Sequence, residues 1–173
     1  MSIILGGTNP AVTFPDATTQ NTAFIAGAVT QSFIATGVAG TGPTFQAYVA
    51  STQAVTGAVA TKLALNAKEW DTSSAFDAVT NYRYTPLVAG YYQVSAGCPT
   101  VTTAAGTNSI AIYKNGSLYK LNAIATNGIP NISCMVSLNG STDYIECYIN
   151  LGTTQNISAS GNNFMSACLV RAA

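Results

Sequence analysis

From Thr44 onward, glycine, proline, asparagine and aspartate residues divide the chain into short segments of strand length. Several of these segments alternate apolar and polar residues with a period of two, the pattern of a strand with one buried face. No segment has the longer apolar periodicity of an amphipathic helix. The sequence therefore predicts an all-β, antiparallel sandwich. The expected strands are 45–49, 60–66, 82–87, 91–98, 108–114, 118–125, 131–138, 143–151 and 164–171.

Two dipeptides predict tight hairpins between expected strands. Asn115-Gly116 and Asn139-Gly140 both combine residues that tolerate positive φ at the two central positions of a short turn.

The alternation also assigns an inward face to four of the expected strands, and all four cysteines lie on these faces. Cysteine is a good small core residue, so buried thiols are the default interpretation. The expected inward residues are Tyr92, Val94, Ala96 and Cys98, then Ile132, Cys134, Val136 and Leu138, then Ile145, Cys147, Ile149 and Leu151, and finally Phe164, Ser166 and Cys168.

One disulfide stays open as an alternative. If Asn139-Gly140 closes a regular hairpin that pairs Leu138 with Asp143, Cys134 lies opposite Cys147. The chain has neither close CxxC pairs nor histidine for a zinc or redox site. We expect reduced, core-packed cysteines with at most this one bridge, because assembly in a cytoplasm favours free thiols.

Charged residues make up only 7% of the chain, whereas about 25% is ordinary for a soluble domain. Six Lys and Arg balance six Asp and Glu, so the basic surface that binds nucleic acid or an anionic membrane is missing. A mean hydropathy of +0.28 indicates a surface kept wet by neutral polar residues or covered by copies of the same chain. We expect neither a nucleic-acid partner nor membrane insertion.

The same composition argues against an enzyme. Without histidine, Ser-His-Asp and Cys-His chemistry is excluded. Paired carboxylates of a glycosidase would have to come from Glu69, Asp71 and Asp77, which fall in one loop-like stretch and are interpreted as solvated turn residues. Calcium binding by these acids or by Asp143 is a minor alternative, since no EF-hand-like loop is present. We expect no catalytic residue, no cofactor and no metal.

Residues 1–43 differ in composition from residues 44–173. Asp16 is their only charge, and residues 37–43 form a Gly-rich hinge. A proline-led turn, with Asp16 as a candidate helix N-cap, precedes a weak helical pattern. We expect an arm for self-association or attachment to a larger particle; the alternative is an extra strand and loop folded onto its own domain. The candidate attachment residues are Phe14, Phe24, Ile25, Val29, Phe33 and Ile34.

The first seven residues have no basic region, and their apolar run is too short for a signal peptide or a membrane-spanning helix. We therefore expect assembly in a cytoplasm.

Five motifs in residues 44–173 resemble, in order and spacing, the C1q/TNF-like jelly-roll domain. This resemblance implies a jelly-roll head that forms a homotrimer around a threefold axis, with the arm leaving from its base. The motifs are Phe45-Gln-Ala-Tyr-Val, Ala75-Phe-Asp with Tyr84-Thr-Pro-Leu-Val-Ala-Gly90-Tyr-Tyr-Gln-Val, Ile112-Tyr-Lys-Asn-Gly116, Leu138-Asn-Gly-Ser-Thr-Asp143-Tyr-Ile, and Phe164-Met-Ser-Ala-Cys168-Leu.

The arm carries a second resemblance. Residues 13–23, TFPDATTQNTA, are similar to the stretch TFPDGTTQTTA that recurs in tail-fibre and other virion proteins of bacteriophages, with Ala17 where glycine is common. Together with a C1q-like head, this implies a virion protein that is displayed on the particle surface and docks on a capsid or tail protein. A capsid decoration or head fibre is favoured over a short tail fibre that touches a host receptor, because the arm is short.

A free carbohydrate- or protein-binding module is the alternative from another class, with a host glycan or receptor as its partner. Aromatic side chains are available for sugar stacking, although strand or trimer-interface roles are the simpler interpretation. These residues are Trp70, Tyr82, Tyr84, Tyr91, Tyr113, Tyr119, Tyr144 and Tyr148.

Overall fold

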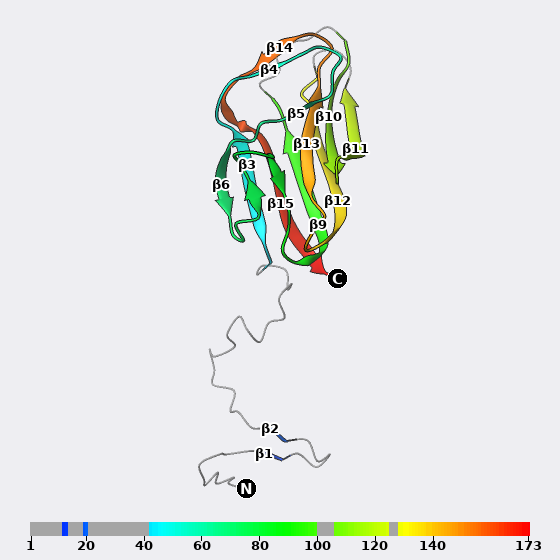
Figure 1. The fold of residues 1–173 in the computed structure, drawn as a ribbon. Coiled ribbons are helices and arrows are strands. Elements are labelled where there is room, and N and C mark those ends of the chain that lie inside the picture. The colour runs from blue at the N-terminus through cyan, green and yellow to red at the C-terminus, as the bar shows by residue number, and fades with distance from the viewer. Residues whose placement is uncertain (1–11, 14–18, 21–41, 100–105, 125–127) are drawn as a thin grey trace. The chain divides into compact units, whose positions relative to one another are not determined.

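The computed structural model describes residues 12–13, 19–20, 42–99, 106–124 and 128–173 (Figure 1). Contacts along the chain divide it into two units, Met1–Ala35 and Thr36–Ala173. The described residues form strands and no helix. The strands are β1 Val12–Thr13, β2 Thr19–Gln20, β3 Thr44–Val49, β4 Gln53–Val55, β5 Thr61–Lys62, β6 Ala67–Asp71, β7 Phe76–Asp77, β8 Arg83–Tyr84, β9 Ala89–Gly97, β10 Asn108–Lys114, β11 Ser117–Ile124, β12 Asn131–Asn139, β13 Ile145–Asn150, β14 Gln155–Ile157 and β15 Ser160–Ala172.

The second unit is a sandwich of two antiparallel sheets. One sheet, here called the β10 sheet, has the strand order β11-β10-β13-β8-β7, and β5 also pairs with β13. The other, the β9 sheet, has the order β12-β9-β15-β3-β6. The strands β4 and β14 form a separate two-stranded ribbon at one end (Figure 1). Because most neighbours in each sheet are distant in sequence and the chain passes repeatedly between sheets, this is jelly-roll connectivity.

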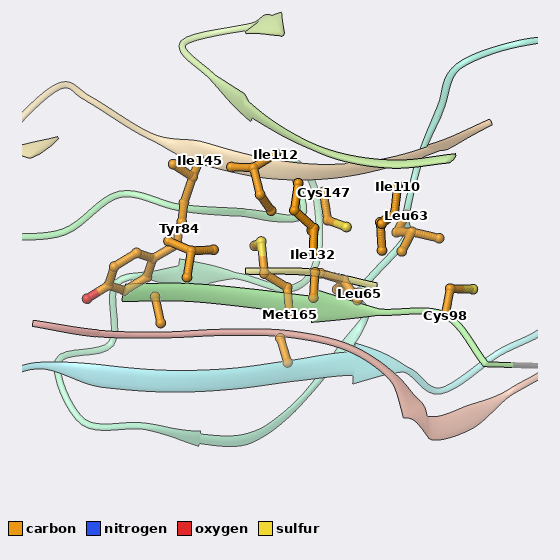
Figure 2. Close-up of a cluster of buried hydrophobic side chains, with 14 of the residues drawn as sticks. Leu63, Leu65, Tyr84, Cys98, Ile110, Ile112, Ile132, Ile145, Cys147 and Met165 are labelled. Atoms are coloured by element: carbon orange, nitrogen blue, oxygen red, sulfur yellow. The ribbon is translucent and has the colours of Figure 1, made fainter. Parts of the chain in front are cut away.

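The core lies between the two sheets, where the inward residues of both interdigitate (Figure 2). Phe45 stacks on Tyr84 with ring centroids 4.3 Å apart, and on Phe76 at 4.9 Å. The inward faces expected for the strands around Val94 and Ile149 are confirmed, since their apolar residues are at most 2% exposed. The all-β sandwich expected from the alternation is therefore confirmed as well.

The Asn115-Gly116 hairpin is confirmed. Asn115 has a φ of 53° and Gly116 a φ of 76°, and the turn joins Lys114 to Ser117 at the end of the β10–β11 ladder. The Asn115 side chain strengthens this turn, because its Oδ1 accepts the Tyr144 N–H at 2.9 Å.

The prediction of a tight hairpin at Asn139-Gly140 is wrong. β12 pairs with β9 and β13 pairs with β10, so this turn carries the chain from one sheet to the other. Asn139 Oδ1 accepts the N–H groups of Ser141, Thr142 and Asp143, which closes a wider turn than a two-residue hairpin allows.

The inward face expected for the last strand is also wrong. In β15 the residues turned to the core are Met165, Ala167 and Leu169, at most 5% exposed, and Cys168 is exposed. The strand carries apolar residues on both faces, so alternation alone does not choose between them. Pairing with β3 and β9, with a register shift between Ser160 and Phe164, decides which face is buried.

The shorter strands are the least predictable part of the head. Of the expected strands 60–66 and 82–87, only Thr61–Lys62 and Arg83–Tyr84 are in ladders. The strands β4, β6, β7 and β14 were not expected, because segments of two to five residues are too short to show an alternation.

In the first unit, β1 pairs with β2 in antiparallel register, Val12 with Gln20 and Thr13 with Thr19. The chain therefore runs in opposite directions at Val12–Thr13 and at Thr19–Gln20. Thr19–Gln20 is a strand, so a helix that Asp16 would cap does not run through these two residues, and the rest of the expected helical pattern lies outside the described residues.

Candidate interaction surfaces

The outer face of the β9 sheet carries an apolar patch at the end where the chain ends. Tyr91, Met135 and Val170 are 47%, 42% and 45% exposed, and they come from three adjacent strands, β9, β12 and β15. Together with Arg171 they line a hollow of about 610 Å³. We call this group of three residues the β9-sheet patch. Large apolar side chains at the outward positions of a sheet are typical of an interface.

The centre of the same face is polar but nearly uncharged. Gln93 donates to Ser133 Oγ at 2.7 Å, and the Ser95 and Ser133 hydroxyls lie 3.1 Å apart. Towards β6, Gln46 donates to the Glu69 carboxylate at 2.6 Å. These small neutral side chains let another surface approach the sheet without desolvating many charges.

A second apolar group lies along the edge strand β11. Leu118, Tyr119 and Leu121 are 55%, 38% and 52% exposed. The Tyr119 hydroxyl donates to the Met135 carbonyl oxygen at 3.0 Å, which ties β11 to the neighbouring edge strand β12. We call these three residues the β11-edge patch.

Neither patch was singled out from the sequence, apart from Tyr91 and Tyr119 among the aromatic residues. The exposure of Met135 could have been predicted from the sequence. It stands at an outward position of the alternation, in a strand whose inward residues are Val136 and Leu138. Apolar residues out of phase with a clear alternation are candidates for contact with a partner.

The candidate aromatic residues divide into three groups. Tyr84 is fully buried in the core, and this burial raises its pKa to about 12. Trp70, Tyr91 and Tyr119 are exposed. The remaining group, Tyr82, Tyr113, Tyr144 and Tyr148, is half-buried.

Two half-buried tyrosines form a stacked pair on the outer face of the β10 sheet. The rings of Tyr113 and Tyr148 have centroids 4.0 Å apart and an interplanar angle of 25°. Lys62 Nζ lies 5.9 Å from the Tyr148 ring and forms an ion pair of 2.5 Å with Glu146, whose side chain is only 5% exposed.

The three candidate carboxylates have structural roles. Glu69 and Asp71 lie in strand β6, so the expectation that they are turn residues is wrong for both, whereas the expected exposure to solvent is confirmed for Glu69. The side chain of Asp71 is only 2% exposed and accepts the N–H groups of Ala75 and Phe76. Asp77 accepts the N–H groups of Thr80 and Val79, both at 2.9 Å, and these bonds hold its pKa at about 2. A carboxylate with such partners organises its own loop.

The cysteines depart from the expectation in two places. Cys134 lies opposite Val94 and Cys147 lies opposite Ile112, so the proposed cross-strand pairing of Cys134 with Cys147 is wrong. Cys98 and Cys147 are buried, Cys134 is half-buried and Cys168 is exposed. Burial raises the pKa of the Cys98 thiol to about 12 and raises that of Cys147 as well.

The expected attachment residues Phe14, Phe24, Ile25, Val29, Phe33 and Ile34 lie outside the described residues. Within the described part of the chain, no helix is long and apolar enough to cross a membrane. In the same part, no three Asp, Glu or Cys residues gather in a way that would hold a metal ion.

Comparison with known proteins identifies the fold. No protein-family model matches the chain, and a search of curated proteins finds no significant match. Solved structures do match. The PRD1 vertex protein P5 superposes with a TM-score of 0.56 at 12% identity, over 75% of this chain and 97% of that chain. Eiger TNF from S. frugiperda gives 0.58 at 10% identity, over 76% and 92%. Murine APRIL at pH 5.0 gives 0.53 at 11% identity, over 74% and 98%.

These structures include a vertex protein and TNF-like proteins, and at such low identity they inform on the fold alone. The TNF-like matches agree with the resemblance found in the sequence motifs. The chain therefore has the fold of a TNF-like jelly roll.

Proposed function

We propose that this protein is a structural protein of a bacteriophage virion, displayed on the particle as a trimer of jelly-roll heads and attached through residues 1–43. The similarity of the fold to a PRD1 vertex protein and the TFPDATTQNTA segment support this proposal. The protein acts by holding surfaces together, and it performs no catalysis.

The observation that carries the trimer is the presence of two exposed apolar patches on one head, which adjoin where the Tyr119 hydroxyl donates to the Met135 carbonyl oxygen. The β9-sheet patch lies on a sheet face, and the β11-edge patch lies along a sheet edge. Two different surfaces that pair between copies form a heterologous contact, and such contacts close into a ring when the rotation from one copy to the next returns to the first copy. The C1q/TNF-like resemblance implies that this ring has three members.

The energetics of this contact are favourable. Fully burying a large apolar side chain contributes about 1.5–3 kcal/mol, and the residues of the two patches have about half of their surface left to bury. The polar centre of the β9 sheet around Ser95 and Ser133 adds little desolvation cost. Each of the three contacts in a ring repeats this gain, which offsets the entropy lost on association.

The geometry of the head also suits an arm at its base. Leu169 donates its N–H to the Pro43 carbonyl oxygen at 3.1 Å, so the head begins beside the end of β15. In Figure 1, the start of β3 and the C-terminus lie at the same end of the sandwich. The ribbon of β4 and β14 is at the opposite end and would point away from the particle.

Light scattering on the purified full-length protein tests the trimer. We expect a trimer for the wild type and dissociation for Val170→Asp, because that substitution places a charge in the β9-sheet patch. Val79→Asp is the matched control, since Val79 is 83% exposed and lies outside both patches. A wild-type monomer at micromolar concentration, or equal effects of the two substitutions, would contradict the proposed interface.

Deleting residues 1–43 tests the attachment. We expect a folded head that is still a trimer and no longer incorporates into particles. Normal occupancy of the truncated head on virions would place the attachment surface on the jelly roll itself. Imaging of labelled particles separates the favoured capsid location from the tail-fibre alternative.

A further inference from the structure

The outer face of the β10 sheet contains a small hollow whose floor is the methyl group of Ala111. In the strand register Ala111 lies between Leu121 on β11 and Tyr148 on β13. A small residue between two large ones leaves a depression, and its volume is about 200 Å³. Drug-sized pockets hold about 300–1,000 Å³, so this space, here called the Ala111 hollow, suits a single small ring.

One wall of the Ala111 hollow is aromatic and rigidly held. Tyr113 and Tyr148 both line the hollow, and their mutual stacking at 4.0 Å fixes the positions of both rings. Aromatic rings in this setting offer an electron-rich π surface and a polar hydroxyl tip. The electropositive C–H groups of a sugar ring are attracted to such a surface.

The rim of the hollow carries polar groups that are available to a ligand. Ser109 and Asn150 lie at one end, where they face each other in the β10–β13 ladder. Among the described residues, the side chains of Ser109 and Asn150 and the hydroxyls of Tyr113 and Tyr148 make no hydrogen bond. A ring bearing hydroxyl groups would find both donors and acceptors around it.

The charges beside the hollow compensate each other. The residues that line the hollow are all uncharged. Beside it, Lys62 and Glu146 form an ion pair with each other, and Arg83, opposite Glu146, lies over the Tyr144 ring. Neither an acidic nor a basic ligand therefore finds a free partner at this site. The combination of an aromatic wall, hydroxyl and amide groups and no net charge is complementary to a neutral sugar.

We propose that the Ala111 hollow binds one neutral pyranose residue of a glycan. The hollow lies on the β10 sheet, away from the β9-sheet patch, and it shares Leu121 with the β11-edge patch, so the site adjoins the proposed trimer contact at this residue. On a virion, repeated copies of such a weak site would act together.

Saturation-transfer NMR on the full-length protein with methyl glycosides of glucose, galactose, mannose and N-acetylglucosamine tests the proposal. We expect saturable binding of at least one of these with a dissociation constant of about 1 mM, as for a single ring in a shallow site. Ala111→Leu fills the hollow from its floor and should weaken binding at least about tenfold.

Ala123→Leu is the matched control for Ala111→Leu. Ala123 is exposed on the same face, lies opposite Ser109 on β11 and does not line the hollow. We expect its affinity to stay within about twofold of the wild type. If Ala111→Leu fails to fold, Tyr148→Phe keeps the ring and removes one hydroxyl, and it should still weaken binding.

The proposal is overturned by any of three outcomes. These are no binding of any of the four glycosides up to about 10 mM, equal losses in the Ala111 and Ala123 variants, or binding of anionic sugars alone. NMR reports on the sugar site and light scattering reports on assembly, so failure of the one and failure of the other are distinguishable although both involve Leu121.

Discussion

Lys62 and Glu146 form an ion pair that joins the short strand β5 to the centre of the β10 sheet. Lys62 Nζ lies 2.5 Å from Glu146 Oε1, and the carboxylate side chain is only 5% exposed. The ammonium also donates to the Asn81 carbonyl oxygen at 3.3 Å, so the pair holds the loop before β8 as well. Only 7% of the residues in the chain are charged, and this ion pair places two of them where they hold β5 and the loop before β8 against the sheet.

We expect Lys62→Met to destabilise the protein by about 2 kcal/mol, because it leaves a buried carboxylate without its partner. The double variant Lys62→Met with Glu146→Leu should recover most of this loss, since it removes both charges. Urea unfolding followed by circular dichroism measures the free energy of unfolding of the single variants and of the double variant. A double variant as unstable as the sum of its parts would show that the two residues act separately.

Gly140 and Gly116 provide a comparison of two positive-φ glycines, with φ of 73° and 76°. A Cβ at Gly140 would overlap the Ala89 backbone nitrogen, whereas at Gly116 the nearest atom is the Tyr144 hydroxyl oxygen at 3.4 Å. We expect Gly116→Ala to cost about 1–2 kcal/mol from backbone conformation. Gly140→Ala should cost at least about 1 kcal/mol more from the clash. Equal thermal shifts in the two variants would contradict the tight packing of the Asn139 turn on β9.

Asp77 should make the protein sensitive to acid. Backbone N–H donors, Thr80 first and then Val79, lower its pKa from the ordinary 3.8 to about 2. Because the folded protein favours the charged carboxylate, this stabilisation is complete above the ordinary pKa and is lost as the pH falls towards 2. Urea midpoints at about pH 5 and about pH 2.5 measure the loss. The Asp77→Asn variant should lose less stability between them, and an unchanged loss would assign the acid sensitivity to other carboxyl groups.

The thiols should react in a definite order. Cys168 is exposed, whereas burial raises the pKa of Cys98, Cys134 and Cys147 and so disfavours their reactive thiolates. In titration with a thiol reagent, we expect an early reaction that Cys168→Ser abolishes, a slower reaction of the half-buried Cys134, and two reactions that require unfolding, those of Cys98 and Cys147.

Cys168 also reports on assembly, because it lies opposite Gln93 on the β9 sheet. If copies associate through this face, Cys168 should react more slowly in the wild type than in Val170→Asp. Equal rates in both proteins would indicate that the face stays open.

The sequence by itself determined the strands whose alternation is long and unbroken. The strands around Val94 and Ile149 have one face of apolar residues and were assigned correctly to the core. The Asn115-Gly116 turn was equally readable, since its positive φ values depend on local chemistry. The ordered motifs also identified the jelly roll, because each depends on residues that are close in sequence.

Only the tertiary structure decided which strands are neighbours and which face of an ambiguous strand is buried. Asn139-Gly140 has the composition of a hairpin, yet the ladders with β9 and β10 place β12 and β13 in different sheets. The position of Cys168 was also decided by strand pairing. The strand β15 has apolar residues on both faces, and its pairing with β3 and β9 leaves Cys168 on the outer face. The Ala111 hollow depends on three strands lying side by side, and no local pattern encodes that juxtaposition. Pairing between distant segments depends on the free energy of the whole sandwich, so it cannot be predicted from the pattern of each segment alone.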